Sequence, residues 1–166
     1  MRTVFVLFLG AMLCLGSAQG QARVEVYPDD RMMWSDILMH VEQGVVRAGH
    51  DWRGDVIFTT VPGKIFSGYS TSTFDLIYSV RDNQLIQGDS YFSDAILYTW
   101  DDMKLYIGDS TFPLDLVYTI RPHPFNEGVF GLFKEDSIST FDRICVFQGV
   151  PNTTEIFALL LAQGLL

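Results

Sequence analysis

Residues 94–110 read DAILYTWDDMKLYIGDS, and this stretch decides the fold. It holds a run of β-branched and aromatic residues, then acidic residues, then a second short apolar run that ends at a glycine. Two such runs with turn-forming residues between them are typical of a β-hairpin. The stretch therefore predicts two antiparallel strands joined by a tight turn at Asp101 and Asp102.

The same pattern recurs along the chain with a period of about twenty residues. Each unit is marked by a central aromatic position, a glycine about ten residues after it and an aspartate shortly before it. The aromatic positions are Phe58, Tyr78, Tyr98 and Tyr118, with Met39 one residue out of register upstream; the glycines are Gly49, Gly68, Gly88, Gly108 and Gly128; the aspartates are Asp36, Asp55, Asp75, Asp94, Asp115 and Asp142. A fixed period indicates a repeat architecture in which each unit packs on its neighbours.

The side chains of each first strand divide between two faces. Leu76, Tyr78 and Val80 share one face and Ser79 lies on the other, because side chains alternate along a strand. We expect the tyrosine face to pack in the core and the serine and threonine positions to point outward.

A hairpin of this length cannot bury its apolar face alone, so neighbouring hairpins must share a core. A closed barrel, a flower-like ring and an open solenoid would all satisfy the period. Closed arrangements have no exposed sheet edges, and the chain has few of the lysines that protect open edges. We therefore predict an all-β fold of tandem β-hairpin repeats closed into a flower-like or barrel-like array.

One unit is longer than the others. Asp142 follows Asp115 by 27 residues, which places about seven extra residues in a loop within 121–135. Such a departure from the repeat could hold a specific function, or it could be a last repeat that has drifted.

The period ends before the C-terminus. Asn152 and Glu155 have the spacing of a capping box, which is typical of the start of a helix. We expect one short helix over 153–163, ended by Gly164. Because it has almost no polar face, we expect it to be buried against the hairpins.

The chain begins with the features of a secretory signal. Arg2 precedes an apolar run of about a dozen residues and then small residues, whereas a membrane-spanning helix needs roughly 20 apolar residues. We predict that residues 1–20 are a removable signal peptide, 21–34 an N-terminal lead-in and 35–166 the β-hairpin repeat domain including the helix. The mature protein is then secreted or periplasmic, with no membrane span.

The charge of the chain excludes classes of partner. The chain has 20 acidic and 11 basic residues, and the predicted cleavage removes only Arg2 among them, so the formal charge goes from −9 to −10. Such a protein is repelled by phosphate backbones and anionic membrane surfaces, so we expect no nucleic-acid partner. Cys145 is the one cysteine left after cleavage, so we expect no internal disulfide.

Tandem units of an Asp-led strand, a turn and a strand ending in Gly-Asp-Ser, best seen in residues 94–110, resemble the bacterial four-fold beta-flower domain family. The resemblance covers roughly residues 35–166, and the expected C-terminal helix fits it. The chain departs from it by having about six Asp-led units, a weak first unit at 35–50 and the insertion after Ile120. The family implies no assigned activity, so no catalytic residue follows from the resemblance.

Four aromatic residues are the candidate ligand-binding residues: Trp52, Trp100, Tyr69 and Tyr91. Repeated aromatic side chains beside polar groups could form several sugar or small-ligand subsites, and multivalency would strengthen weak binding. The alternative is that these side chains fill the core or cover the junctions between hairpins.

No set of residues points to catalysis, a metal or a cofactor. Aspartates near the turns could bind calcium or act as paired glycosidase carboxylates, but no D-x-D-x-D-G loop is present and Asp is ordinary in turns. No histidine has a partner at metal-ligand or nucleophile–base spacing. We therefore expect no enzyme, no metal and no cofactor. The aspartates are Asp82, Asp89, Asp101, Asp102, Asp109 and Asp136, and the histidines are His40, His50 and His123.

We therefore expect an exported β-repeat protein that is structural or mediates interactions with a protein or glycan partner. A multivalent carbohydrate or small-ligand binding module is the alternative. A hydrolase that uses carboxylates of the repeat turns is the second alternative.

Overall fold

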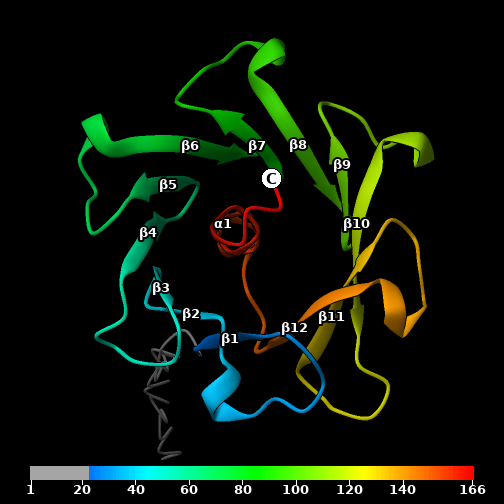
Figure 1. The fold of residues 1–166 in the computed structure, drawn as a ribbon. Helices are drawn as coiled ribbons and strands as arrows, with labels where there is room; N and C mark the ends of the chain where they lie inside the picture. The colour runs from blue at the N-terminus through cyan, green and yellow to red at the C-terminus, as the bar shows by residue number, and fades with distance from the viewer. Residues whose placement is uncertain (1–22) are drawn as a thin grey trace, which may run out of the picture.

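The fold is a closed β-barrel of hairpins with a helix at its centre (Figure 1). The computed structural model describes residues 23–166, and the predicted signal peptide, residues 1–20, lies outside them. Within the described residues, twelve strands close the barrel in the order β1-β12-β11-β10-β9-β8-β7-β6-β5-β4-β3-β2. The predicted all-β class, the closed hairpin array and the short C-terminal helix are confirmed.

The elements of the described chain are short. The strands are β1 (Val24–Tyr27), β2 (Met39–Glu42), β3 (Val45–Ala48), β4 (Val56–Val61), β5 (Lys64–Ser67), β6 (Leu76–Arg81), β7 (Gln84–Gln87), β8 (Ile96–Asp101), β9 (Lys104–Ile107), β10 (Leu116–Pro122), β11 (Val129–Lys134) and β12 (Arg143–Gln148). The helices are α1 (Thr153–Ala162) and the 3-10 turns η1 (Trp34–Asp36), η2 (Thr73–Asp75), η3 (Ser93–Ala95), η4 (Pro113–Asp115) and η5 (Thr140–Asp142). No helix within residues 23–166 is both long and apolar enough to cross a bilayer.

The hairpin turns have the left-handed backbone that matches the twist of paired strands. Asp82 and Asn83 have φ of 49° and 62°, as a two-residue type I′ turn requires. In the next hairpin the turn lies one residue later than predicted, because Asp101 still pairs with Lys104 in the ladder. Positive φ falls instead on the residues after Asp101, namely Asp102 at 43° and Met103 at 61°.

The sixth strand pair of the ring is formed by the two ends of the chain. β12 pairs with β1, and its Phe147–Val26 pair matches the Val80–Leu85 pair inside the β6–β7 hairpin. The predicted lead-in, 21–34, therefore contains the strand that closes the barrel. Five hairpins and the β12–β1 pair complete a ring of six units, so the four-fold count implied by the resemblance is wrong, and each Asp-led segment supplies the first strand of one unit.

The barrel interior is lined by one equivalent residue from each second strand. All six side chains are fully buried: Val26, Val46, Ile65, Leu85, Leu105 and Leu132. Side chains alone can just fill a barrel of about eight strands, so a wider barrel needs another element inside. Here α1 fills that space, and its residues 154–160 are buried.

Both ends of α1 are capped as the sequence predicts. The Asn152 side chain accepts a hydrogen bond from the Glu155 backbone, and the Glu155 carboxylate accepts one from the Asn152 backbone, both at 3.0 Å. Gly164 has a φ of 68°. Its N–H and that of Leu165 donate back to carbonyls of the last turn, which forms a Schellman motif. The predicted capping box and the buried plug are confirmed.

The prediction for the two strand faces is half right. Tyr78 and its equivalents pack against the core, as expected. The hydroxyl positions do not point into solvent: three of them donate to the carbonyl of the repeat glycine that follows the neighbouring strand, and the buried Thr119 hydroxyl has no hydrogen-bond partner within residues 23–166. The three bonds are Thr59 to Gly68 and Ser79 to Gly88, both 2.7 Å, and Thr99 to Gly108, 2.6 Å.

The fifth hairpin departs from the repeat in two ways. The extra residues form a longer loop, 123–128, between β10 and β11. The repeat glycine is replaced by Glu135, whose N–H donates to Val117 O at 2.7 Å as the Gly108 N–H donates to Leu97 O at 2.8 Å. Gly128 lies outside that position, so the prediction that it is the fifth repeat glycine is wrong.

His40 is expected to make stability depend on pH. It is fully buried, its Nδ1 lies 2.7 Å from the Gly49 carbonyl, and its Nε2 has no hydrogen-bond partner in the described chain. Burial lowers its pKa, opposed by the bond to Gly49. The pKa of His40 is lower in the folded state than the unfolded value of about 6.5, so its neutral form contributes fully to stability above that pH. The free energy of unfolding decreases as the pH drops below about 6.5, by at most about 1.4 kcal/mol per pH unit.

The measurement is urea unfolding of the protein and of His40→Asn across this pH range. Asparagine keeps a donor for the Gly49 carbonyl and does not titrate, so the variant should lose the acid-side decline. A decline of the same slope in both proteins would contradict the prediction.

Candidate functional site

The linkers between hairpins project outward from the barrel, and we call each one a petal (Figure 1). Three petals, residues 68–75, 108–115 and 135–142, end in equivalent 3-10 turns. In each, a serine hydroxyl donates to the carboxylate five residues later and accepts a bond from the backbone N–H two residues later. The serine–aspartate pairs are Ser70–Asp75, Ser110–Asp115 and Ser137–Asp142. These bonds hold the three petals in one conformation.

The petal tips are the residues immediately before those aspartates: Phe74, Leu114 and Phe141. Their side chains are 97%, 99% and 97% exposed. Sequence reasoning missed them, although an apolar residue directly before the repeat aspartate in three linkers was the available signal. Single exposed apolar side chains are ordinary and only contiguous apolar patches mark binding surfaces, so the tips are candidates where they adjoin other apolar surface.

The aspartates at the start of the petals have a different role from those at the tips. They join neighbouring hairpins by ion pairs and hydrogen bonds with basic or amide side chains. The contacts are Asp89 with Lys64 and Arg81, Asp136 with Lys104 and Arg121, and Asp109 with the Gln84 amide. In the part of the chain that the structure describes, no group of three or more His, Cys, Asp or Glu side chains is placed to hold a metal ion.

The four predicted aromatic residues do not come together. Trp100 packs in the barrel core. The other three lie exposed on petals, and basic groups lie over two of their rings: the Arg81 guanidinium 4.1 Å from the centre of Tyr91 and the Arg53 guanidinium 4.9 Å from that of Trp52. They can offer separate stacking surfaces, but not one shared subsite.

Two clefts lie side by side at the fifth hairpin. One, of about 450 Å³, is lined by the tip Leu114, and the other, of about 430 Å³, by the tip Phe141. Leu116 and Glu135 line both, so we call the pair the Glu135 groove. Apolar residues on its floor include Tyr106, Ile107 and Tyr118, while Lys134 lines only the Phe141 cleft.

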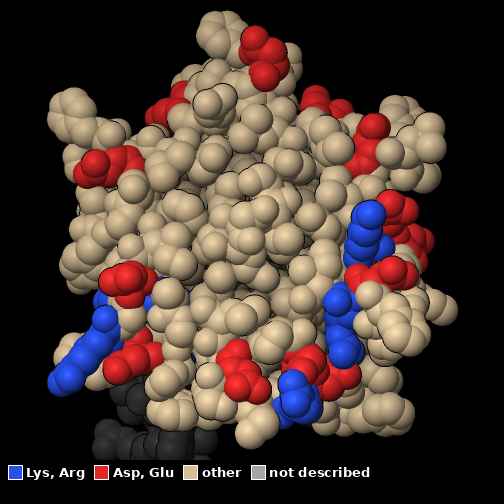
Figure 2. Space-filling model, viewed as in Figure 1, with Lys and Arg blue, Asp and Glu red and all other residues tan. Residues whose placement is uncertain are grey.

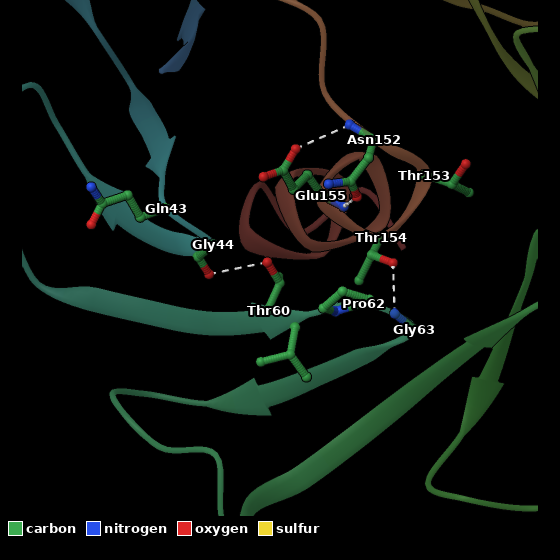
Figure 3. A pocket seen from close by; sticks show the side chains of 10 residues that line it. Gln43, Gly44, Thr60, Pro62, Gly63, Asn152, Thr153, Thr154 and Glu155 are labelled. Atoms are coloured by element: carbon green, nitrogen blue, oxygen red, sulfur yellow. Dashed lines mark hydrogen bonds between the residues drawn. The ribbon is translucent and has the colours of Figure 1, made fainter. Parts of the chain in front are cut away.

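A larger cleft, of about 580 Å³, lies at the mouth of the barrel beside the first turn of α1 (Figure 3). The Gly63 N–H donates to the Thr154 hydroxyl at 3.3 Å, and the Thr60 hydroxyl donates to Gly44 O at 3.0 Å. The buried Glu155 carboxylate belongs to the capping box of α1. The cleft is thus the seam at which the helix is anchored to the hairpin turns.

Cys145 and His123 are occupied by packing and by a charged contact, respectively. Cys145 is fully buried, and burial raises the pKa of its thiol to about 12, so it is not a thiolate at neutral pH. His123 Nε2 lies 3.7 Å from the Asp30 carboxylate, which also pairs with Arg143 at 2.7 Å. These contacts tie the long loop of the fifth hairpin to the first petal.

Comparison with known proteins gives one family. The family model described as 6-fold beta flower protein matches residues 26–144. The chain is similar to the X-ray structure of a protein from Arabidopsis thaliana, with 12% sequence identity and a TM-score of 0.42 over 88% of this chain and 90% of that chain. No curated protein matches the chain.

Proposed function

The chain belongs to the 6-fold beta flower family, and we propose that it is an exported, non-enzymatic module that binds a protein partner through its petal tips. The supporting observation is the near-complete exposure of Phe74, Leu114 and Phe141 in three equivalent turns. Truncation of the few side chains that carry most binding energy in an interface typically costs more than about 1 kcal/mol each. Because the serine–aspartate bonds already order these petals, binding loses little conformational entropy.

The proposed place of action is the periplasm or the outside of the cell. Cell fractionation tests this: the protein should be found outside the cytoplasm, with a mass that lacks the predicted signal peptide.

A multivalent carbohydrate or small-ligand module is the second candidate. It is supported by the exposed rings of Tyr69, Trp52 and Tyr91, and is weakened by the guanidinium groups over two of them. Hydrolysis by turn carboxylates has less support, because Asp89 and Asp109 are bound to neighbouring side chains.

The test is selection of random peptides on the chain without residues 1–20, followed by binding measurements on a variant with all three tips changed to serine. We expect the selected peptides to bind the unchanged protein and to lose at least about tenfold in affinity on the triple variant. Val150→Ser, which removes an exposed apolar side chain outside the petals, is the matched control and should leave binding unchanged. Equal binding to the triple variant would contradict the proposed function, and hits confined to a glycan array would favour the second candidate.

A further inference from the structure

We propose that the petal tips recognise a polypeptide segment with lysine or arginine beside apolar residues, and that this segment binds first in the Glu135 groove. The inference rests on the proposed function and adds the chemistry of the partner. The groove is bounded by two tips, Leu114 and Phe141, so an apolar side chain of the partner can contact a tip and the groove floor together. Such a contact removes apolar surface from water on both molecules.

The charge beside the tips sets the charge of the partner. Asp75, Asp115 and Asp142 bond to serine hydroxyls, and none of them forms an ion pair with Lys or Arg within residues 23–166. Asp89 and Asp136, at the start of two petals, are by contrast held by basic groups. Figure 2 shows acidic side chains around the rim of one face, with Lys and Arg beside some of them, and an uncharged centre. A segment that meets the tips therefore meets negative charge without a counter-ion.

One carboxylate of the groove belongs to Glu135, a residue with an unusual backbone conformation. Glu135 has a φ of 50°, at the position where Gly68, Gly88 and Gly108 also have positive φ. A residue with a Cβ is strained there, so glycine would be the more stable choice. The Glu135 carboxylate has no ion pair or side-chain hydrogen bond in the described chain, which leaves it available to a partner. Backbone strain of this kind is often retained where it contributes to function.

The basic residues of the groove do not neutralise Glu135. Lys104 pairs with Asp136 at 3.7 Å, and Arg143 pairs with Asp30. Lys134 is the remaining cation, and it does not line the cleft beside Leu114; Lys104 does line that cleft, together with the Asp136 carboxylate with which it pairs. We therefore place the partner's lysine or arginine in that cleft, against Glu135.

Two other occupants fit the groove less well. A second copy of the chain would bring together two molecules with a charge of about −10 each, which repel one another. A sugar would need several free hydrogen-bonding groups beside the tips, and there the serine and aspartate side chains already bond to each other, which leaves chiefly the Glu135 carboxylate.

The experiment measures fluorescence anisotropy of three labelled, end-blocked peptides with the chain without residues 1–20. In the first, lysine alternates with phenylalanine; in the second, glutamate replaces lysine; in the third, serine replaces phenylalanine. We expect the first peptide to bind, with affinity that falls as salt is raised. The second should not bind, and the third should bind at least about tenfold more weakly.

Three variants locate the site. Leu114→Ser and Glu135→Gln should each weaken the first peptide by about five- to tenfold, and Glu135→Gln should also reduce the salt dependence. Glu135→Gly should weaken binding to the same extent while raising the melting temperature by about 2–4 °C, which excludes loss of folding as the cause. Val150→Ser should change nothing.

The outcomes separate this inference from the proposed function. The basic-partner inference is overturned if the glutamate peptide binds as tightly as the lysine peptide, or if neither Glu135 variant changes the affinity. If binding in that case still requires the tips, the proposed function stands. Binding indifferent to the tips overturns both. Self-association of the chain that depends on Leu114 and Phe141 overturns the inference in favour of a second copy.

Discussion

A chain that begins at residue 28, and so lacks β1, is expected to lose cooperative folding. β1 pairs with both β2 and β12, so its removal opens the barrel and leaves two strand edges unpaired. It also removes Val24 and Val26, two fully buried core residues. The measurement is thermal unfolding followed by circular dichroism, together with size-exclusion chromatography. We expect no sharp transition and a shift to larger species.

A chain that begins at residue 23 is the matched control, because it keeps β1. It should melt as the mature protein does. A peptide of residues 23–28, added in excess to the shorter chain, should restore part of the transition by supplying the missing strand. A shorter chain that melts as sharply as the control, at the same temperature, would show that β1 does not close the barrel.

Replacing Phe157 by alanine is expected to destabilise the protein by about 3–5 kcal/mol. Phe157 is fully buried on α1, at the centre of the barrel, and the strands around it cannot collapse inward to fill the space because their hydrogen bonds hold the ring. That loss is a large part of the roughly 5–15 kcal/mol that stabilises a typical domain. Urea unfolding measures it as a lower midpoint with an unchanged slope.

Phe74→Ala provides the comparison at an exposed position. The same side chain is lost from a petal tip that is almost wholly in solvent, so the change should stay within about 0.5 kcal/mol. Equal losses at Phe157 and Phe74 would mean that α1 does not fill the barrel.

Local chemistry made the hairpins and the helix predictable. The turn residues Asp82 and Asn83 and the strand runs on either side of them identify a hairpin, because left-handed turns and β-branched strands depend on near neighbours. The capping pair Asn152 and Glu155 identifies the start of α1 for the same reason. The turn after β8 was placed one residue early, since Asp101 and Asp102 are equally good turn residues and only the ladder decides between them.

Long-range pairing was not predictable in the same way. The lead-in contains no hairpin of its own, so its β1 could be recognised only from its pairing with β12. Ser79 is polar and alternates with tyrosine, which indicates an exposed face; it is buried because its hydroxyl donates to the carbonyl of Gly88, just after the next strand. The exposed tips were missed because apolar residues in a linker are ordinarily read as core.

The sequence by itself determined that this protein consists of β-hairpins of one period with an apolar helix after them, because those features are encoded within about twenty residues. The tertiary structure alone decided that six strand pairs close into one ring, that the first and last strands form the sixth pair, and that Phe74, Leu114 and Phe141 face solvent. These features depend on which distant segments meet, and the free energy of those contacts comes from a core that no single repeat contains.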